Sequence, residues 1–241
     1  FDYIGENRFE AVVCDSSTPS IINDLGVVEK INKLYPGVKV IMVGRHVSAM
    51  PKETFKLLDS LKFLAIREYE YIVRDWLYAI KDGTPLKDVK GLVWRDNFDN
   101  IVTNDPMPPI KNLDEIPFVT KTYKKFLTIN DYYYGHSLHP LVVFDTSRGC
   151  PFKCTFCAYP QTFSGHKMRY RSIENVADEF EYVANNFPNI KTIMLEDDTF
   201  IISVKRTEEL ADELIKRGNK IPFDSNCRYD TKADVKFFKK L

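Results

Sequence analysis

Three cysteines in one short stretch are the residues of this sequence with the clearest capacity for chemistry. Cys150, Cys154 and Cys157 fall within eight residues, in the spacing C-x-x-x-C-x-x-C. Thiolates are soft ligands, so three of them on one loop can converge on a single metal centre. Three thiolates also leave one iron of a four-iron cluster without a protein ligand, and a substrate or cofactor could bind at that iron.

Half of a structural zinc site is the alternative for the same thiols. Structural zinc sites close with four ligands, usually delivered as C-x-x-C pairs, and the sequence has no second pair. His166 and Cys227 are the residues available as a fourth ligand. A zinc-stabilised module without catalysis would be colourless, whereas an iron–sulfur protein is brown.

A resemblance to a known family favours the iron–sulfur interpretation. The cysteine spacing, the aromatic Phe156 before the third cysteine and the strand-like run Leu141–Phe144 together resemble the radical S-adenosylmethionine (radical SAM) superfamily. The resemblance implies a [4Fe-4S] cluster on the three cysteines, with SAM bound to the open iron and Phe156 covering the cluster. It also implies reductive cleavage of SAM to a 5′-deoxyadenosyl radical, which takes a hydrogen atom from an unactivated carbon of the substrate.

A run of three carboxylates follows the next strand along the chain. These are Glu196, Asp197 and Asp198, and adjacent like charges cost stability unless a cation is near. By the resemblance, the run takes the position of the family's Gly-Gly-Glu motif, with Asp198 aligned to the Glu, and would bind the ammonium group of SAM. Three solvated carboxylates at a strand end are the alternative.

Arg228 lies at the end of the third strand expected in this half of the chain. Its planar guanidinium can hold a carboxylate through two parallel hydrogen bonds, so we expect it to bind the carboxylate of SAM. An ion pair with Asp230 at the rim of the fold is the alternative for the same side chain.

The elements that position these residues alternate between strand and helix. Hydrophobic periodicity predicts both kinds of element. In the C-terminal half we expect strands over 141–144, 190–195 and 221–228, and helices over 172–183, 208–216 and 232–241. Barrels of this kind place their chemistry at the carboxyl ends of the strands. The resemblance implies the first half of a radical SAM partial (β/α) barrel.

The N-terminal half shows the same alternation. We expect strands over 11–14, 38–43 and 63–66, and helices over 21–34, 55–61 and 72–80. Such βαβ units predict a parallel sheet that binds ligands outside its carboxyl edge. Polar or glycine-bearing loops follow all three strands, and their candidate ligand-binding residues are Ser17, Thr18, Gly44, His46, Glu68 and Glu70. Every α/β sheet has such loops, so no single loop establishes a ligand.

Taken together, these loops resemble the second part of the cobalamin-binding (B12-binding) domain that precedes the barrel in many radical SAM enzymes. That family carries a Ser/Thr run, here Ser16–Thr18, a Gly-Gly-x-His-like turn, here Gly44–His46, and a Gly-Glu-x-Glu-like turn, here Arg67–Glu70. Its first strands are missing, as is the Asp-x-His-x-x-Gly loop that ligates cobalt in other B12 proteins. The resemblance implies a partial flavodoxin- or Rossmann-like domain with cobalamin as an optional cofactor.

Residues 88–140 differ in pattern from both halves. Gly91–Trp94 and Ile101–Thr103 flank a polar turn, which predicts a β-hairpin. The prolines of 105–117 exclude a helix or a central strand there, so we expect a linker.

We therefore expect three parts along the chain. A B12-binding-like α/β domain covers 1–87, the hairpin and linker cover 88–140, and the radical SAM barrel covers 141–241. The chain opens on Phe1 and ends at Leu241 without a helix-stop signal. We expect a fragment, incomplete at both ends.

Composition excludes several other classes of protein. Of the 241 residues, 44% are hydrophobic and 28% charged, as in ordinary globular proteins. Lys and Arg total 34, as do Asp and Glu, so no net charge favours nucleic acid as a partner. No apolar run approaches the roughly 18 residues of a membrane span, and the cysteines form no disulfide framework. We expect cytoplasmic localisation.

The function expected from these features is cobalamin-dependent methyl transfer by a radical SAM enzyme. Its partners would be a small-molecule or lipid-like substrate and a one-electron reductant such as flavodoxin or ferredoxin. A radical SAM enzyme without cobalamin, of the methylthiotransferase-like, cyclase or lipid-modifying kind, is the alternative. Cobalt content separates the two.

Overall fold

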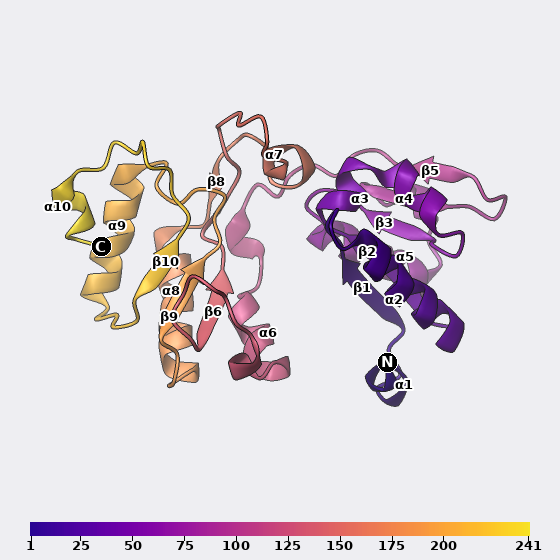
Figure 1. The fold of residues 1–241 in the computed structure, drawn as a ribbon, viewed down its shortest axis with the longest axis horizontal. Coiled ribbons are helices and arrows are strands. Elements are labelled where there is room, and N and C mark those ends of the chain that lie inside the picture. Colours follow the sequence, from indigo (N-terminus) through magenta and orange to yellow (C-terminus); the bar gives the residue numbers. More distant parts are fainter. The chain divides into compact units, whose positions relative to one another are not determined.

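The computed structural model describes residues 1–241, which divide into two compact units (Figure 1). The first unit comprises residues 1–110 and 152–166, and the second comprises residues 111–151 and 167–241. The chain thus enters the second unit after the first sheet, returns to the first for the segment that follows Cys150, and then completes the second. Both units are mixed α/β structures, as the alternating pattern predicts.

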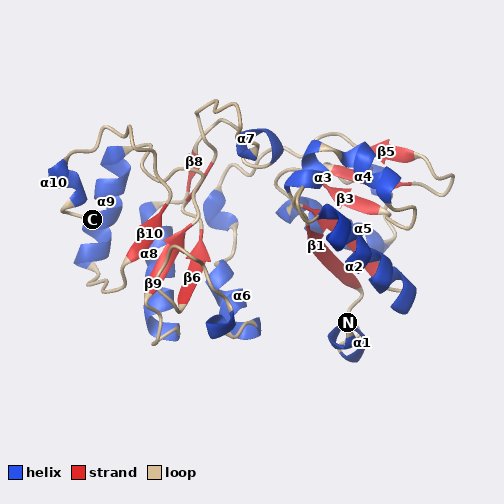
Figure 2. Cartoon of the chain, viewed as in Figure 1, coloured by secondary structure: helices blue, strands red, loops and turns tan.

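A five-stranded sheet in the order β1-β2-β3-β4-β5 forms the centre of the first unit (Figure 2). Strands β1 (Ala11–Asp15), β2 (Lys39–Val43) and β3 (Phe63–Ala65) are parallel, as predicted. Strands β4 (Leu92–Arg95) and β5 (Ile101–Thr103) form the predicted hairpin. Strand β4 pairs with β3 in antiparallel orientation, so the hairpin extends the N-terminal sheet.

Both faces of this sheet are covered because its strands are apolar on both sides. Val40 and Met42 pack in one core cluster, and Ile41 and Val43 in the other, as the two-residue period of a strand requires. Leu25, Val28 and Ile31 of one helix join the first cluster, and Ile72 and Trp76 of another join the second. The helices of this sheet are α1 (Asp2–Glu6), α2 (Ile21–Leu34), α3 (Arg45–Ala49), α4 (Pro51–Leu57) and α5 (Glu70–Asp82).

The helix predicted over 55–61 was misplaced. Helix α4 occupies Pro51–Leu57, and the chain is extended at Leu58. Proline is preorganised for the first turn of a helix, so Pro51 sets the start of α4. Leu61, which the periodicity assigned to the helix, is fully buried in the first core cluster from the loop that follows.

A three-stranded parallel sheet in the order β10-β9-β6 forms the centre of the second unit. Its strands are β6 (Leu141–Phe144), β9 (Thr192–Leu195) and β10 (Phe223–Ser225). Helix α8 (Ile173–Asn186) and helix α9 (Val204–Lys216) pack beside one another. The described strand β10 and helix α10 (Val235–Phe238) are shorter than the predicted 221–228 and 232–241.

Serine caps fix where the two long helices of this unit begin. The Ser172 hydroxyl accepts a hydrogen bond from the Asn175 N–H at 3.1 Å, and that of Ser203 accepts one from Arg206 N–H at 3.3 Å. Each cap satisfies an N–H that has no partner within its helix. The core beneath contains Phe144 and Phe180, whose rings meet edge to face at 5.5 Å.

The segment before β6 belongs to the second unit through buried polar contacts. Helix α6 (Val119–Phe126) places Thr120 against Glu179, whose carboxylate accepts the Thr120 hydroxyl at 2.7 Å. Asp114 accepts the backbone N–H of Ser172 at 2.8 Å. Residues 111–126 are therefore anchored on helix α8 and its cap.

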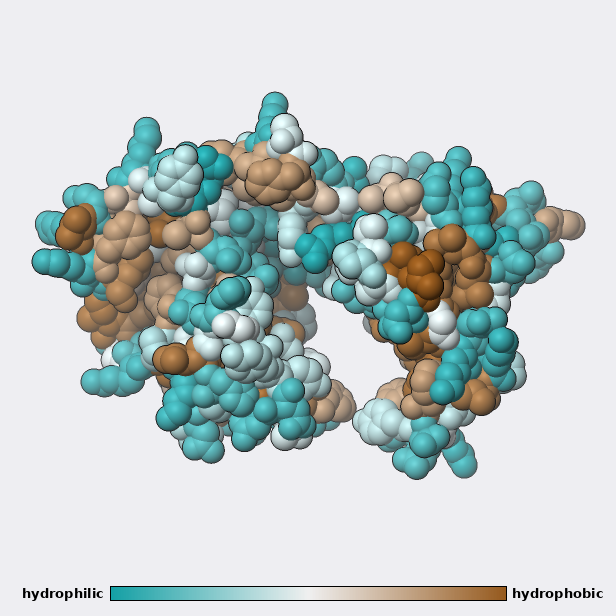
Figure 3. Space-filling model, in the orientation of Figure 1, coloured by the Kyte–Doolittle hydropathy of each residue, from teal (hydrophilic) through white to brown (hydrophobic).

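Polar side chains surround several smaller apolar areas on the visible surface (Figure 3). None of the helices has the length and hydropathy needed to cross a bilayer.

Candidate functional site

The cysteine loop follows β6 and the two-residue strand β7 (Ser147–Arg148), which pairs with β8 (Arg169–Tyr170). Cys150, Cys154 and Cys157 form no disulfide and are half-buried. A turn joins the second and third, with Cys157 N–H donating to the Cys154 carbonyl at 3.1 Å. Phe156 is 90% exposed in the same turn, so its ring is free to cover a bound group.

The donor set suits a cluster with one open iron, because it offers three reduced thiols and no fourth cysteine nearby in sequence. In the structure, no three His, Cys, Asp or Glu side chains lie close enough together to hold a metal ion. Cys227, one of the two candidate fourth ligands of the zinc alternative beside His166, is exposed in the segment after β10.

Asp197 has different partners from those expected of a SAM contact. Its side chain is 2% exposed. One carboxylate oxygen accepts the backbone N–H groups of Thr146 and Ser147, at 2.5 and 3.2 Å. The other accepts their hydroxyls, at 2.7 and 2.6 Å. Burial raises the pKa of this carboxyl, while hydrogen bonds from the Ser147 hydroxyl and from the backbone and hydroxyl of Thr146 act to lower it.

The other two carboxylates of the run are more accessible. Glu196 is exposed. Asp198 is half-buried, and its Oδ2 accepts the backbone N–H of Gly149 at 3.1 Å, next to Cys150. The three adjacent side chains therefore have three different environments, which a strand end produces by turning successive residues in different directions.

Two arginines complete the support of the cysteine loop. The carbonyl oxygen of Thr146 accepts the Arg171 N–H at 3.0 Å and lies 3.4 Å from Nη2 of Arg206. The Arg206 Nη2 also donates to the Arg171 carbonyl at 2.8 Å. The Arg171 guanidinium donates to the Asp145 carbonyl at 2.8 Å and forms a buried ion pair with Glu179 at 2.6 Å.

Sequence reasoning missed this supporting network. The sequence pattern assigned no role to Thr146, Ser147 or Arg171. Arg171 is in fact 7% exposed. The signal that could have found the network is the pair of hydroxyl residues directly after β6, opposite an acidic run directly after β9, since parallel neighbours end at the same edge.

Arg228 is paired with Asp230 in the structure. Its Nε and Nη2 donate to the two carboxylate oxygens at 2.7 and 2.5 Å. Both side chains are partly exposed, at 34% and 46%. The pair holds the Asp230 pKa below its ordinary value, chiefly through the Arg228 hydrogen bond. The rim ion pair considered from the sequence is thus present, and it occupies the guanidinium face that a SAM carboxylate would need.

The strand-end loops of the first unit form a tight polar edge. Gly44 has φ of +102°, and a Cβ there would lie 2.3 Å from Asp15 Oδ1 and 2.5 Å from the Ser16 carbonyl oxygen. Such contacts exclude any side chain. The backbones of the loops after β1 and β2 are consequently in close contact at Gly44.

His46 is buried at this edge with one ring nitrogen unpartnered. Its Nδ1 lies 3.1 Å from the Thr18 hydroxyl, while Nε2 has no hydrogen-bond partner. The Ser17 hydroxyl pairs with Ser20 at 2.9 Å, within the turn that precedes α2. Buried polar atoms are nearly always satisfied, so the free Nε2 is a position where a bound polar group would fit.

Glu68 and Glu70 are placed differently from each other. Glu68 is 5% exposed, and its Oε2 accepts the Ile110 N–H at 2.9 Å, so it holds the chain at the end of the first unit's main segment. Glu70 is the first residue of α5. Glu68 thus anchors the chain at Ile110, whereas Glu70 begins a helix, and both stay predicted ligand-binding residues.

The segment after the third cysteine packs on these strand-end loops within the first unit. Helix α7 (Tyr159–Thr162) contacts α3, and the Arg45 guanidinium lies 4.3 Å from the centroid of the Tyr159 ring. The rings of Tyr69 and Phe163 lie 5.8 Å apart. The chain that carries Cys154 and Cys157 is thereby fixed beside the residues expected to bind cobalamin.

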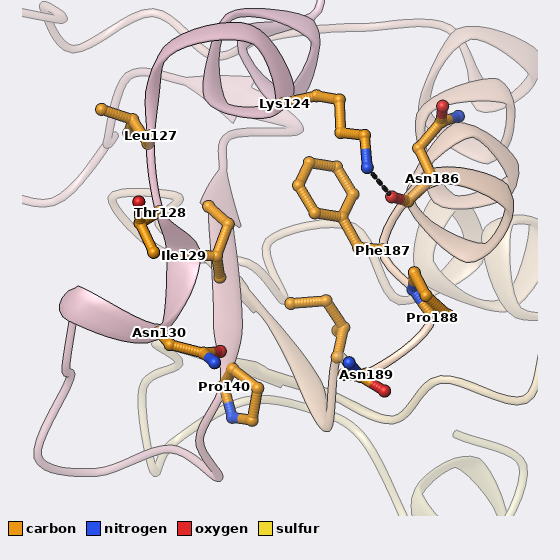
Figure 4. A pocket seen from close by; sticks show the side chains of 11 residues that line it. Lys124, Leu127, Thr128, Ile129, Asn130, Pro140, Asn186, Phe187, Pro188 and Asn189 are labelled. Carbon is orange, nitrogen blue, oxygen red and sulfur yellow. Dashed lines mark hydrogen bonds between the residues drawn. The ribbon is translucent and has the colours of Figure 1, made fainter.

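A groove of about 240 Å³ opens elsewhere in the second unit (Figure 4). It is lined by residues that include Pro140, directly before β6, and Ile190, shortly before β9. Lys124 Nζ donates to the Asn186 carbonyl beside Phe187 at 2.8 Å. The groove therefore lies at the amino ends of the strands, opposite the carboxyl ends where parallel α/β sheets bind their ligands.

The cysteine-bearing half of the chain matches a known protein family. Residues 144–241 match the family model described as the Radical SAM superfamily. An uncharacterized methyltransferase of Pyrococcus horikoshii is 31% identical over 221 residues, which cover 91% of this chain and 46% of that protein. The anaerobic magnesium-protoporphyrin IX monomethyl ester cyclase of Rubrivivax gelatinosus is 24% identical, over 91% of this chain and 39% of its own length.

A solved structure shares the fold over nearly the whole chain. The cobalamin-dependent S-adenosylmethionine radical enzyme OxsB, with aqua-cobalamin and S-adenosylmethionine bound, superposes with a TM-score of 0.74 at 20% identity. The match covers 98% of this chain and 32% of OxsB. The chain spans less than half the length of each of these relatives. The family match includes all three cysteines, the hydroxyl residues Thr146 and Ser147 and the acidic run 196–198, so residues 144–241 match a radical SAM domain.

Proposed function

We propose that this chain carries the cofactor-binding core of a radical SAM enzyme that performs cobalamin-dependent methyl transfer. The [4Fe-4S] cluster would be held by Cys150, Cys154 and Cys157. When bound, the cluster and SAM supply the one-electron chemistry that activates an unactivated carbon of the substrate. The chain's own part is to bind these groups, orient them and exclude water.

The single observation that carries the proposal is the set of three cysteines, none in a disulfide, in the spacing C-x-x-x-C-x-x-C within a radical SAM family match. The name of the Pyrococcus horikoshii relative supports methyl transfer. The shared fold with a cobalamin-dependent enzyme supports cobalamin.

The residues around the loop have separate roles in this proposal. Glu196 and Asp198 present carboxylates to the ammonium group of SAM, and Phe156 covers the cluster. Arg228 exchanges its Asp230 partner for the SAM carboxylate, since a guanidinium binds both in the same two-point geometry.

Cobalamin would lie at the carboxyl edge of the first sheet. There the Gly44 backbone, the Thr18 hydroxyl and the unpartnered Nε2 of His46 offer polar contacts. We accordingly interpret 1–87 as a B12-binding-like domain, 88–140 as hairpin and linker, and 141–241 as the first half of a radical SAM barrel.

A second candidate is radical chemistry without cobalamin, such as ring formation. The contacts of Arg45 with Tyr159 and of Tyr69 with Phe163 favour it, because protein side chains already cover part of the edge where cobalamin would bind. The 24% identical cyclase relative is consistent with this alternative.

Anaerobic reconstitution with iron and sulfide tests the proposal. We expect a four-iron electron paramagnetic resonance signal after reduction, a change in that signal on adding SAM, and loss of the signal in Cys154→Ala. Zinc without iron in the purified protein would refute the proposal. Cobalamin added to the same sample separates the two candidates, since stoichiometric cobalt retained after gel filtration supports methyl transfer and its absence supports the second candidate.

The substrate and the reductant are further parts of the proposal. We infer a small-molecule or lipid-like substrate and an external one-electron donor of the flavodoxin or ferredoxin type. Turnover with chemically reduced donor, followed by mass spectrometry for a mass increase of one methyl group, would identify the reaction class.

A further inference from the structure

We propose that Asp197 is a positioning residue for the cysteine loop and makes no contact with SAM. The inference rests on the proposed function for its consequence, but its geometry stands on the protein alone. Asp197 fixes Thr146 and Ser147, which precede Cys150 by four and three residues.

Every acceptor direction of the Asp197 carboxylate is used inside the protein. Two backbone N–H groups and two hydroxyls donate to it, at distances between 2.5 and 3.2 Å. A carboxylate has about four lone-pair sites. With the side chain 2% exposed, an ammonium group could reach Asp197 only by displacing these donors.

The Thr146 peptide is held on its other side as well. Its carbonyl accepts the Arg171 N–H at 3.0 Å and faces Nη2 of Arg206 at 3.4 Å. A carboxylate from the end of β9 and a guanidinium from the start of α9 thus hold the same backbone unit through its N–H and its C=O. Opposite charges on the two sides keep the pair close to neutral, which limits the cost of burying each charge.

Asp198 continues the restraint toward the first cysteine. Its Oδ2 accepts the Gly149 N–H at 3.1 Å. Three of the four backbone N–H groups that follow Asp145, those of Thr146, Ser147 and Gly149, therefore donate to two adjacent acids just after β9. The backbone that leads to Cys150 is therefore held in place before any metal binds. Because it is already ordered, less conformational entropy is lost when the cluster assembles.

Hydrogen exchange on the metal-free protein tests the restraint itself. In Asp197→Ala we expect the Thr146 and Ser147 amides to exchange about ten- to a hundredfold faster, because each loses a charge-assisted hydrogen bond. Amides of β10 and helix α8 should keep their wild-type rates. Asp224→Ala is the matched control, since Asp224 is half-buried on β10 and accepts a single hydroxyl, from Thr192 at 3.2 Å. Unchanged exchange at Thr146 and Ser147 in Asp197→Ala would overturn the inference.

Cluster retention tests the consequence. We expect reconstituted Asp197→Ala to lose iron to a chelator about tenfold faster than wild type, in proportion to the loosened loop. Asp197→Asn should recover much of the retention, because an amide can accept the two N–H groups while its NH₂ donates to the two hydroxyls. If both variants keep the cluster but lose the SAM-dependent change in the resonance signal, Asp197 contacts SAM and the inference is wrong.

Two further variants decide the matter if Asp197→Ala does not fold. Thr146→Val and Ser147→Ala each remove one hydroxyl donor and leave the carboxylate in place. Combined with Asp197→Asn in double-mutant cycles on iron-loss rates, they should be non-additive, and additive effects would count against a shared restraint. Failure of the wild type to take up any cluster would refute the proposed function, whereas the exchange result on the metal-free protein would remain as the separate test of Asp197.

Discussion

Arg228 and Asp230 form a two-point ion pair, with nitrogen–oxygen distances of 2.7 and 2.5 Å. The hydrogen bond from Arg228 keeps the pKa of Asp230 below its ordinary value. A depressed carboxyl pKa contributes stability that is present above the unfolded-state pKa and is lost as pH falls through the folded-state pKa. Both side chains are solvent-accessible, so the contribution is screened.

Replacing Arg228 should therefore have two measurable effects. In metal-free Arg228→Ala, the Asp230 pKa should rise toward its ordinary value, as followed by carboxyl-carbon NMR during an acid titration. In the reconstituted protein, the dissociation constant for SAM should increase at least about tenfold, since a bidentate charged contact is lost. A variant with raised Asp230 pKa and unchanged SAM affinity would assign Arg228 to the rim ion pair alone.

Removal of single cysteines should separate cluster ligands from other thiols. Cys154→Ala should fail to retain a four-iron cluster, because two thiolates cannot hold it. Cys227→Ala is the control, since Cys227 is an exposed free thiol, and iron content should equal that of wild type. Iron and sulfide analysis with the visible absorption spectrum gives the comparison, and iron loss in Cys227→Ala would indicate a fourth protein ligand.

Breaking the buried ion pair of Arg171 and Glu179 should destabilise the second unit. Glu179 is 1% exposed and pairs with Arg171 at 2.6 Å. Glu179→Ala should lower the free energy of unfolding by about 3–5 kcal/mol, because it leaves a buried guanidinium uncompensated. Glu174→Ala, at an exposed position of the same helix, should change it by less than about 0.5 kcal/mol. Urea denaturation of both variants measures the difference, and equal midpoints would show that water compensates Arg171.

Two glycines offer a matched test of the close contact between the loops after β1 and β2 in the first unit. Gly44→Ala should destabilise by about 1–3 kcal/mol or more, because φ of +102° and a Cβ contact of 2.3 Å cannot both be relieved. Gly26→Ala, in helix α2 with no atom near the new Cβ, should stabilise by about 0.5–1 kcal/mol. Thermal melts of the two variants should therefore shift in opposite directions. A Gly44→Ala protein as stable as wild type would mean that the loops after β1 and β2 can separate freely.

Much of the scaffold was predictable because its signals are local. The apolar runs at 11–14, 38–43 and 141–144 became strands, and the hairpin flanked by Gly91 and Thr103 formed as expected. The cysteine spacing lies within one loop and needs no tertiary information. The family expectation drawn from it is confirmed by the match over residues 144–241.

The roles of individual acids were not predictable, because they depend on partners distant in sequence. Asp197 and Thr146 are separated by 51 positions, and Glu68 and Ile110 by 42. The sequence assigned Glu196, Asp197 and Asp198 together to SAM, with Asp198 aligned to the family's Glu, but it could not show that Asp197 is buried, Asp198 half-buried and Glu196 exposed. Composition also could not reveal that Arg171 is buried, because its two partners, the Glu179 carboxylate and the Asp145 carbonyl, come close to it only in the folded chain.

The anchoring of residues 111–126 has a practical consequence for cutting or exchanging modules of this chain. Thr120 supplies a hydroxyl to the buried Glu179, and Asp114 supplies a carboxylate to the capped start of helix α8. A C-terminal module cut just before β6 would lack both Thr120 and Asp114 and so would lose these two contacts. A boundary placed before Lys111 would carry them along, so chimeras joined there should express as folded protein while those joined at Leu141 should aggregate.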